Sequence, residues 1–295
     1  MPGGRRAWAP LAARRLLCIV LLSALGCLSP ARAGEVAQRP LVLGILPFQS
    51  PVTLFKRFAP LRDYLSKKLG HAVILETARD FPEFIHRTAE RRYDFVITAP
   101  HFTLLALESG KYELRARYTK PLRAVVVVRS DSPITDASQL AGRTVSTPPR
   151  FAVITLLGQH YLAGLGLTGA RAPHYEAYLT HNASHQAMIG GEASAAIISI
   201  NVYNLARKRS SPLRIVGSSP PIPSMGILAA SDLPSSLRIR FGKALVEMSN
   251  TESGRALLKR MAYPGFRVAT PRDFAPARPY LEDYLHITGH NADKR

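Results

Sequence analysis

Short apolar runs alternate with longer amphipathic runs from residue 40 onward, and this alternation limits the possible folds of the chain more than any other feature. Residues 41–46 are apolar and end at Pro47, which predicts a buried strand. Residues 53–69 place large apolar side chains three or four positions apart, which predicts a helix that ends at Gly70. Pro60 falls inside that pattern, and we expect it to kink or split the helix.

The same two patterns repeat along the rest of the chain. Short apolar runs predict strands at residues 72–75, 94–98, 113–118, 122–129, 144–146, 172–175, 195–200, 213–216 and 226–230. Amphipathic runs predict helices at residues 80–91, 151–165, 184–189 and 234–285, with a further helix that starts at Pro100. Strand–helix repetition of this kind predicts largely parallel sheets covered by helices on both faces.

Two strands, at residues 113–118 and 122–129, follow one another without a helix in between. We interpret the second as a connection between two lobes, and the proline-rich residues 220–223 as a stiff return segment. The predicted fold class is α/β with two lobes, each a mainly parallel sheet flanked by helices. Residues 40–127 and 224–288 form the first lobe, and residues 128–223 form the second. We expect a ligand cleft between the lobes, because strand carboxyl ends and helix N-termini meet there and favour anions.

The first 33 residues have the order of a secretory signal peptide. Arginines between residues 5 and 15 precede an apolar run at residues 16–28, and the small residues Ala31 and Ala33 follow as a cleavage site. The apolar run is shorter than the roughly 20 residues that a membrane-spanning helix needs. A lipoprotein signal ending at Cys27 is an alternative, although Ala24 stands where that pattern expects leucine.

Removing this segment changes what the composition permits. The 262 remaining residues contain no cysteine, since Cys18 and Cys27 are both removed, which excludes disulfide scaffolds, thiol enzymes and zinc–thiolate sites. Without the leader's five arginines, 34 basic residues face 20 acidic ones, a net charge of +14 that attracts anions. Nucleic acid is not the expected partner, because no dense basic run is interleaved with aromatic residues.

Six segments, in their order along the chain, resemble the phosphate/phosphite/phosphonate-binding proteins of ABC transporters. They are residues 93–100 (YDFVITAP), 125–134 (VVVVRSDSPI), 140–145 (LAGRTV), 184–187 (SHQA) with 191–196 (GEASAA), and 225–233 (MGILAASDL). The resemblance implies a type-2 periplasmic-binding-protein fold whose two lobes close on an oxyanion. It also implies a monomer in the periplasm that binds a small anionic ligand without a cofactor and hands it to an inner-membrane ABC permease. Related domains report to a membrane histidine kinase, which leaves a sensor role as the alternative.

One segment departs from the family pattern. The family has a Ser-Thr-Ser-Gly-like turn at a helix N-terminus, where hydroxyls and amides hold the phosphonate oxygens. Residues 146–152 of this chain are STPPRFA, and the two prolines supply no amide donors. Arg150 is a charged donor that compensates for this loss. The fold expectation is unaffected, but the identity of the anion stays open among phosphorus and sulfur oxyanions.

Candidate ligand-binding residues follow the predicted strands or begin the helices after them. They are Gln49, Ser50, Ala99, His101, Ser146, Thr147, Arg150, Ser184, His185, Ser199 and Asn201. Several have plainer alternatives. Ser50, Ser184 and Asn201 are also suited to capping the following helices, and His101 and Arg150 to lying in solvent.

No set of residues indicates catalysis, so we predict a binding protein rather than an enzyme. The chain has no nucleophile elbow, P-loop or zinc-protease helix. His174, His181 and His185 have helical spacing, but Pro173 and the strand signals around Tyr175 argue against one helix carrying all three. We therefore predict no metal site.

Overall fold

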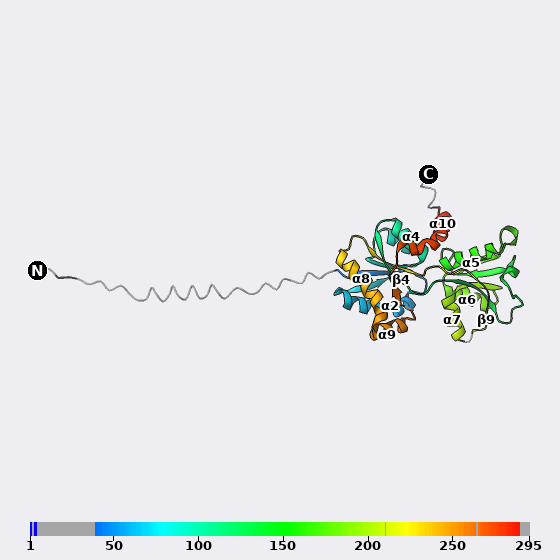
Figure 1. The fold of residues 1–295 in the computed structure, drawn as a ribbon, viewed down its shortest axis with the longest axis horizontal. Helices are drawn as coiled ribbons and strands as arrows, with labels where there is room; N and C mark the ends of the chain where they lie inside the picture. Colours follow the sequence, from blue (N-terminus) through cyan, green and yellow to red (C-terminus); the bar gives the residue numbers. More distant parts are fainter. Residues whose placement is uncertain (2, 5–38, 210, 264, 290–295) are drawn as a thin grey trace. The chain divides into compact units, whose positions relative to one another are not determined.

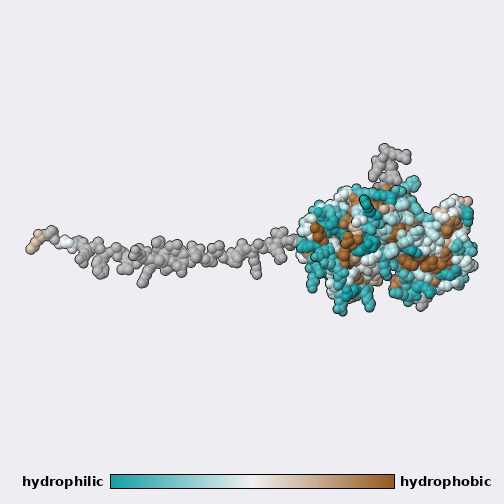
Figure 2. Space-filling view, viewed as in Figure 1, coloured by the Kyte–Doolittle hydropathy of each residue, from teal (hydrophilic) through white to brown (hydrophobic). Residues whose placement is uncertain are grey.

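The computed structural model describes residues 1, 3–4, 39–209, 211–263 and 265–289. The chain divides into two units, Met1–Arg39 and Pro40–Arg295, and the strands and helices described here belong to the second. The predicted signal peptide lies almost entirely outside the described residues. Within the described part, no helix has the length and apolar character needed to cross a membrane. Hydrophilic side chains cover much of the face seen in Figure 2, and the hydrophobic ones there form separate patches.

Six strands form the first sheet, in the order β11-β4-β10-β3-β1-β2. They are β1 (Leu41–Ile45), β2 (Val73–Glu76), β3 (Phe95–Thr98), β4 (Tyr112–Tyr118), β10 (Gly226–Ala230) and β11 (Phe266–Arg267). β1 pairs in parallel with β2 and β3, whereas β10 is antiparallel to β3 and β4. The sheet is mixed because β10, which returns from the second lobe, runs against its neighbours.

Helices cover both faces of this sheet. α2 (Pro51–Leu69), α8 (Ser235–Glu247) and α9 (Glu252–Met261) pack together on the face where Phe95 stacks on Phe241, with 3.8 Å between ring centroids. α4 (Pro100–Glu108) lies on the other face, with α3 (Phe81–Ala89) and α10 (Arg278–Ile287) packed against it. In Figure 1, α4 and α2 lie on opposite sides of β4, which belongs to this sheet. Glycine is required at position 226, because a Cβ there would lie 2.3 Å from Thr103 Oγ1 of α4.

Five strands form the second sheet, in the order β7-β6-β8-β5-β9. They are β5 (Ala124–Arg129), β6 (Thr144–Thr147), β7 (His174–Ala177), β8 (Ala195–Ser199) and β9 (Leu213–Ser218). β6 pairs in parallel with β7 and β8, and β5 is antiparallel to β8 and β9. α5 (Val153–Gly164) packs on the face of Ile197, and α6 (His181–Ile189) and α7 (Ile200–Lys208) pack on the face of Ile198.

The two lobes are joined by a pair of antiparallel segments, at residues 119–123 and 219–225. The first runs from β4 to β5 and the second from β9 to β10, and β4 pairs with β10 as β5 pairs with β9. Between them, the backbone N–H of Leu122 donates to the carbonyl of Ile222 at 2.8 Å, and that of Ile222 to Leu122 at 2.9 Å. All of β5 lies in the second sheet, so the first crossing precedes the expected boundary at residue 128.

Three local features differ from the sequence-based expectations. Of the kink or split expected at Pro60, the split is wrong, because α2 is one helix from residue 51 to residue 69 with Pro60 inside it. α6 begins at His181 rather than at Ser184, because Thr180 Oγ1 accepts the backbone N–H of Ala183 and caps the helix. β11 interrupts the region expected to be helical, and its two residues pair with the end of β4.

Candidate ligand-binding site

Most of the predicted site residues lie where a strand ends and a helix begins. β1 leads into α2, β3 into α4, β6 into α5 and β8 into α7. β1 and β3 are parallel, as are β6 and β8, so the carboxyl ends of each pair lie at one edge of their sheet. Helix N-termini gather at these edges, and their unpaired amide N–H groups attract anions. The predicted residues in these turns are Gln49, Ser50, Ala99, His101, Ser146, Thr147, Arg150, Ser199 and Asn201.

The helices at these edges differ in how their first turns are capped. Ser50 Oγ accepts the N–H of Thr53 at 3.4 Å in α2, and Ser199 Oγ accepts that of Val202 at 3.2 Å in α7. Asn201 therefore lies inside α7 and does not cap it. α4 and α5 instead begin after Ala99 and Ala152, and neither helix has a side-chain cap. Their first-turn amides lack the acceptor that a polar cap supplies.

His101 connects these two uncapped helix ends across the lobes. It lies at the start of α4, and its Nε2 lies 3.1 Å from the carbonyl oxygen of Phe151, just before α5. The imidazole stacks on the ring of Phe102, with 3.8 Å between centroids, and the side chain has no solvent exposure. The N-termini of α4 and α5 therefore lie close together in this conformation.

The contact with Phe151 fixes the tautomer of His101. A carbonyl oxygen only accepts, so Nε2 carries the proton and Nδ1 is an acceptor. Nδ1 is buried and has no partner within the described part of the chain. Burial lowers the pKa of His101 from 6.5 to about 3, so the ring is neutral at physiological pH.

The hydroxyls of residues 146–155 point into the second lobe. Ser146 Oγ donates to the carbonyl of Ser184 at 2.8 Å, and Thr147 Oγ1 to that of Pro148 at 2.9 Å. Thr155 Oγ1 lies 3.1 Å from the carbonyl oxygens of both Pro148 and Pro149. The bonds from Thr147 and Thr155 hold the two prolines in place. The hydroxyl protons of the predicted ligand residues Ser146 and Thr147 are therefore occupied.

Arg150 is exposed at the tip of this turn. Its guanidinium carbon lies 5.1 Å from the centroid of the Phe151 ring. Among the residues with described coordinates, no carboxylate lies within ion-pair distance of it. Gln49, in the first lobe, accepts a hydrogen bond from Arg57 at 3.1 Å through its Oε1 atom. The amide group of Gln49 keeps its own donors.

The first turn of α6 carries three buried polar atoms that lack a partner among the described residues: His181 Nδ1, Ser184 Oγ and His185 Nε2. Burial lowers the pKa of His181 to about 4 and lowers that of His185, so both rings are neutral at pH 7 and each offers one N–H donor. Ser146 bonds to the backbone of this turn, which places it beside the end of β6. His181 was not among the predicted ligand residues; its position directly after the cap Thr180 is the sequence signal that identifies it.

Comparison with known proteins assigns the chain to a family. Residues 43–274 match the model of the periplasmic substrate-binding proteins of phosphonate ABC transporters. The chain belongs to this family. A phosphonates-binding periplasmic protein of Escherichia coli K12 is 23% identical over 273 residues, which cover 85% of this chain and 78% of the relative.

Solved structures agree in fold with this family member. The binding-protein component of an ABC phosphonate transporter from Pseudomonas aeruginosa aligns with a TM-score of 0.72 and 14% identity, over 82% of this chain and 85% of that one. PhnD1 from Prochlorococcus marinus, solved with methylphosphonate, aligns with a TM-score of 0.70 and 17% identity, over 83% and 97% of the two chains. The two-lobed fold of periplasmic binding proteins, expected from the sequence, is confirmed.

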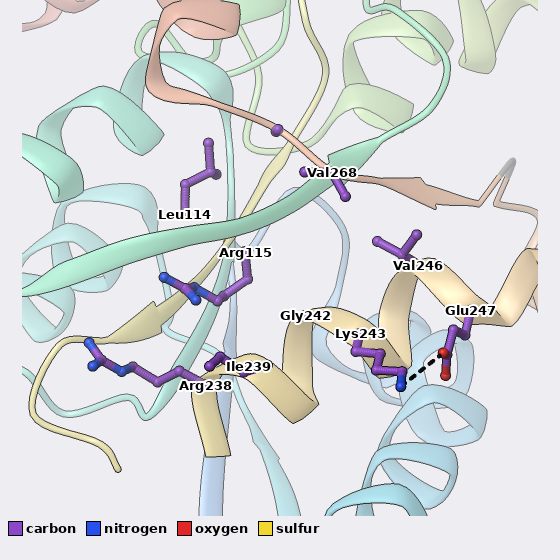
Figure 3. A pocket seen from close by; sticks show the side chains of 10 residues that line it. Leu114, Arg115, Arg238, Ile239, Gly242, Lys243, Val246, Glu247 and Val268 are labelled. Atoms are coloured by element: carbon purple, nitrogen blue, oxygen red, sulfur yellow. Dashed lines mark ion pairs between the residues drawn. The ribbon is translucent and has the colours of Figure 1, made fainter. Parts of the chain in front are cut away.

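Two surface pockets of this family member lie away from the strand ends. The first, of about 490 Å³, lies between β4, α8 and Val268, with Arg115 and Arg238 at one end and the Lys243–Glu247 ion pair at the other (Figure 3). The second, of about 370 Å³, lies between α5, the crossing segment and α10. Neither is lined by a predicted ligand residue. In the described part of the chain, no group of three His, Cys, Asp or Glu side chains is arranged to hold a metal.

Proposed function

We propose that this family member captures a small oxyanion of the phosphonate class between its lobes and delivers it to an ABC permease. The observation that carries the proposal is the meeting of two uncapped helix N-termini, those of α4 and α5, at the His101–Phe151 contact. The uncapped amide groups at both ends are donors suited to an anion, and the helix dipoles add to their attraction. A ligand held there touches both lobes.

The side chains around these helix ends supply further donors. Arg150 offers a guanidinium that has no ion-pair partner among the described residues, and a guanidinium fork matches two oxygens of a phosphonate. His181 and His185 are neutral donors in the first turn of α6. Ser199 accepts a helix amide and keeps its hydroxyl proton for the ligand. Ser50 also accepts a helix amide, and its hydroxyl shares a further hydrogen bond with that of Thr53 at 2.9 Å. Gln49, Ser184 and Asn201 complete the proposed site, whereas Ala99 contributes only backbone.

Capture requires motion about the two crossing segments. A ligand that contacts both lobes stabilises the closed orientation by its differential affinity for that state. Binding of this kind needs hydrogen-bond donors but no paired base and nucleophile. The proposed donors fit that requirement, which favours transport of an unmodified solute.

A thermal-shift panel tests the ligand class. Methylphosphonate, phosphite, phosphate, sulfate, thiosulfate and tetrathionate are added in turn to the purified protein. A ligand at about 100 times its Kd stabilises the native state by about 2.7 kcal/mol, which raises the melting temperature measurably. The proposal expects the largest rise with a phosphorus oxyanion, and a flat response to the whole panel refutes it.

Arg150→Ala tests the location of the site. It should weaken binding of the best anion while leaving the melting temperature of the ligand-free protein nearly unchanged, because Arg150 is exposed. Arg207→Ala is the matched control, since Arg207 is an exposed arginine of the same lobe near the end of α7. Equal binding by both variants refutes this placement. If the purified protein binds a membrane sensor kinase rather than a permease, the same ligand site serves the sensor function instead of transport.

A further inference from the structure

α10 lies across both lobes and has a polar side-chain contact with each. Arg278 pairs with Glu108 of α4 in the first lobe. Asp283 Oδ2 lies 2.6 Å from His160 Nε2 of α5 in the second lobe. The two contacts tie a single helix to the two halves of the molecule. The family-model match ends at residue 274, before α10 begins.

α10 is anchored more firmly in the first lobe than in the second. Leu281 is fully buried and Tyr284 is 3% exposed. The Tyr284 ring packs edge-on against Phe102 of α4, with 5.0 Å between centroids. The His160–Asp283 contact is half exposed, with the side chains 44% and 35% accessible. When the lobes rotate, α10 moves with the first lobe, and its contact with α5 is the one that changes.

The orientation in which this contact forms is also the one that assembles the proposed ligand site. Tyr284 packs against Phe151 at 5.6 Å, and the carbonyl of Phe151 accepts the bond from His101. His160 further packs against the ring of Tyr280, with 5.0 Å between centroids. Contacts of α10 with α5 and contacts between the α4 and α5 N-termini therefore occur together.

We propose that α10 is a strap that stabilises the binding-competent lobe orientation, with His160 and Asp283 as positioning residues for the ligand site. Neither residue needs to touch the ligand. The strap raises the population of the competent orientation, and apparent affinity scales with that population. The affinity part of this inference rests on the proposed function, whereas the orientation part is measurable without ligand.

The expected effect of breaking the contact is modest. Half-exposed polar contacts contribute little, so we expect Asp283→Asn to lower the competent fraction and the ligand affinity about twofold to fivefold. Asp283→Glu should restore most of the loss. His160→Ala should have at least the effect of Asp283→Asn, because it also removes the packing on Tyr280. Adding Asp283→Asn to His160→Ala should change little further, because the partner of Asp283 is already absent.

Pulsed electron–electron double resonance, which measures distances between spin labels, tests the lobe orientation directly. Spin labels are attached at Lys259→Cys on α9 and Arg207→Cys on α7, two exposed positions in different lobes. Cys18 and Cys27 are replaced by serine, which leaves the two labels as the sole thiols of the chain. The distance distribution of the ligand-free protein reports the population of lobe orientations.

Glu90→Gln is the matched control, because His86 and Glu90 form another histidine–carboxylate pair, at 3.2 Å within α3. The proposal expects Asp283→Asn to shift the distance distribution and Glu90→Gln to leave it unchanged. An unchanged distribution in Asp283→Asn, or an equal shift in both variants, overturns the strap. Titration with methylphosphonate separates the two proposals: absence of binding to every variant refutes the proposed ligand, while the distances still decide on the strap.

Discussion

Mild acid should destabilise this protein through His101, and the size of the effect follows from its burial. The folded state lowers the pKa of His101 from 6.5 to about 3, because the unexposed ring is costly to charge. At pH values between about 3 and 6.5, His101 is protonated in the unfolded chain but not in the folded chain. Stability therefore rises with pH across this window and is lost as the pH falls below 6.5.

The shift from 6.5 to about 3 gives a definite magnitude at moderate pH. Proton linkage to this one group costs about 0.2 kcal/mol at pH 7 and about 2 kcal/mol at pH 5. The free energy of unfolding should therefore fall by about 2 kcal/mol between these pH values through His101 alone. For a chain of this size the loss corresponds to roughly 4–8 °C in melting temperature.

Urea denaturation at pH 7, 6 and 5 measures this loss in the native protein and in His101→Gln. The glutamine amide can still donate to the carbonyl of Phe151 but does not titrate. We expect the difference between pH 7 and pH 5 to shrink by about 2 kcal/mol in the variant. His174→Gln makes the same replacement at an exposed strand position and controls for the removal of one histidine. An identical pH dependence of stability in the native protein and in His101→Gln would show that His101 does not cause the acid destabilisation.

Three further substitutions test local features by their effect on the free energy of unfolding. Gly226→Ala should cost about 1–3 kcal/mol, because its Cβ would lie 2.3 Å from Thr103 Oγ1; a neutral effect in chemical denaturation would contradict the close approach. Thr155→Val should cost about 1 kcal/mol and weaken anion binding, because it removes the donor to the Pro148 carbonyl. A melting temperature and affinity equal to those of the native protein would show that the donor does not order this turn. Ser50→Ala should cost about 0.5–2 kcal/mol through loss of the α2 cap, and Ser50→Gly should recover most of it if capping is the cause.

The hydrophobic patterns of the sequence predict most of the architecture. The strand expected at residues 226–230 has those bounds as β10, and the helix expected to end at Gly70 does so. The crossing through residues 220–223 is also present, because prolines exclude regular structure there. The spacing of apolar residues predicts which side chains are buried. Because buried side chains pack the helices onto the two sheets, this spacing also predicts the architecture.

The sequence is less informative wherever a distant contact decides the outcome. Ser146 was predicted to face a ligand, but the carbonyl of Ser184, far away in sequence, accepts its proton. Two residues of β11 form a strand only because β4 offers a free edge. The amphipathic pattern of α10 predicts a helix, whereas its position across both lobes follows from Tyr284 and Asp283 meeting partners far away in sequence.

If one small oxyanion binds between the lobes, isothermal titration should detect a single saturable site. Methylphosphonate, phosphite and phosphate are titrated in turn into the native protein at physiological salt. We expect at least one of these anions to saturate the protein at one ligand per chain and to bind more weakly to Arg150→Ala. Heats that do not saturate with any of the three anions would refute a single site. Binding that disappears at higher salt would also refute it, because general attraction to a basic surface is screened in this way.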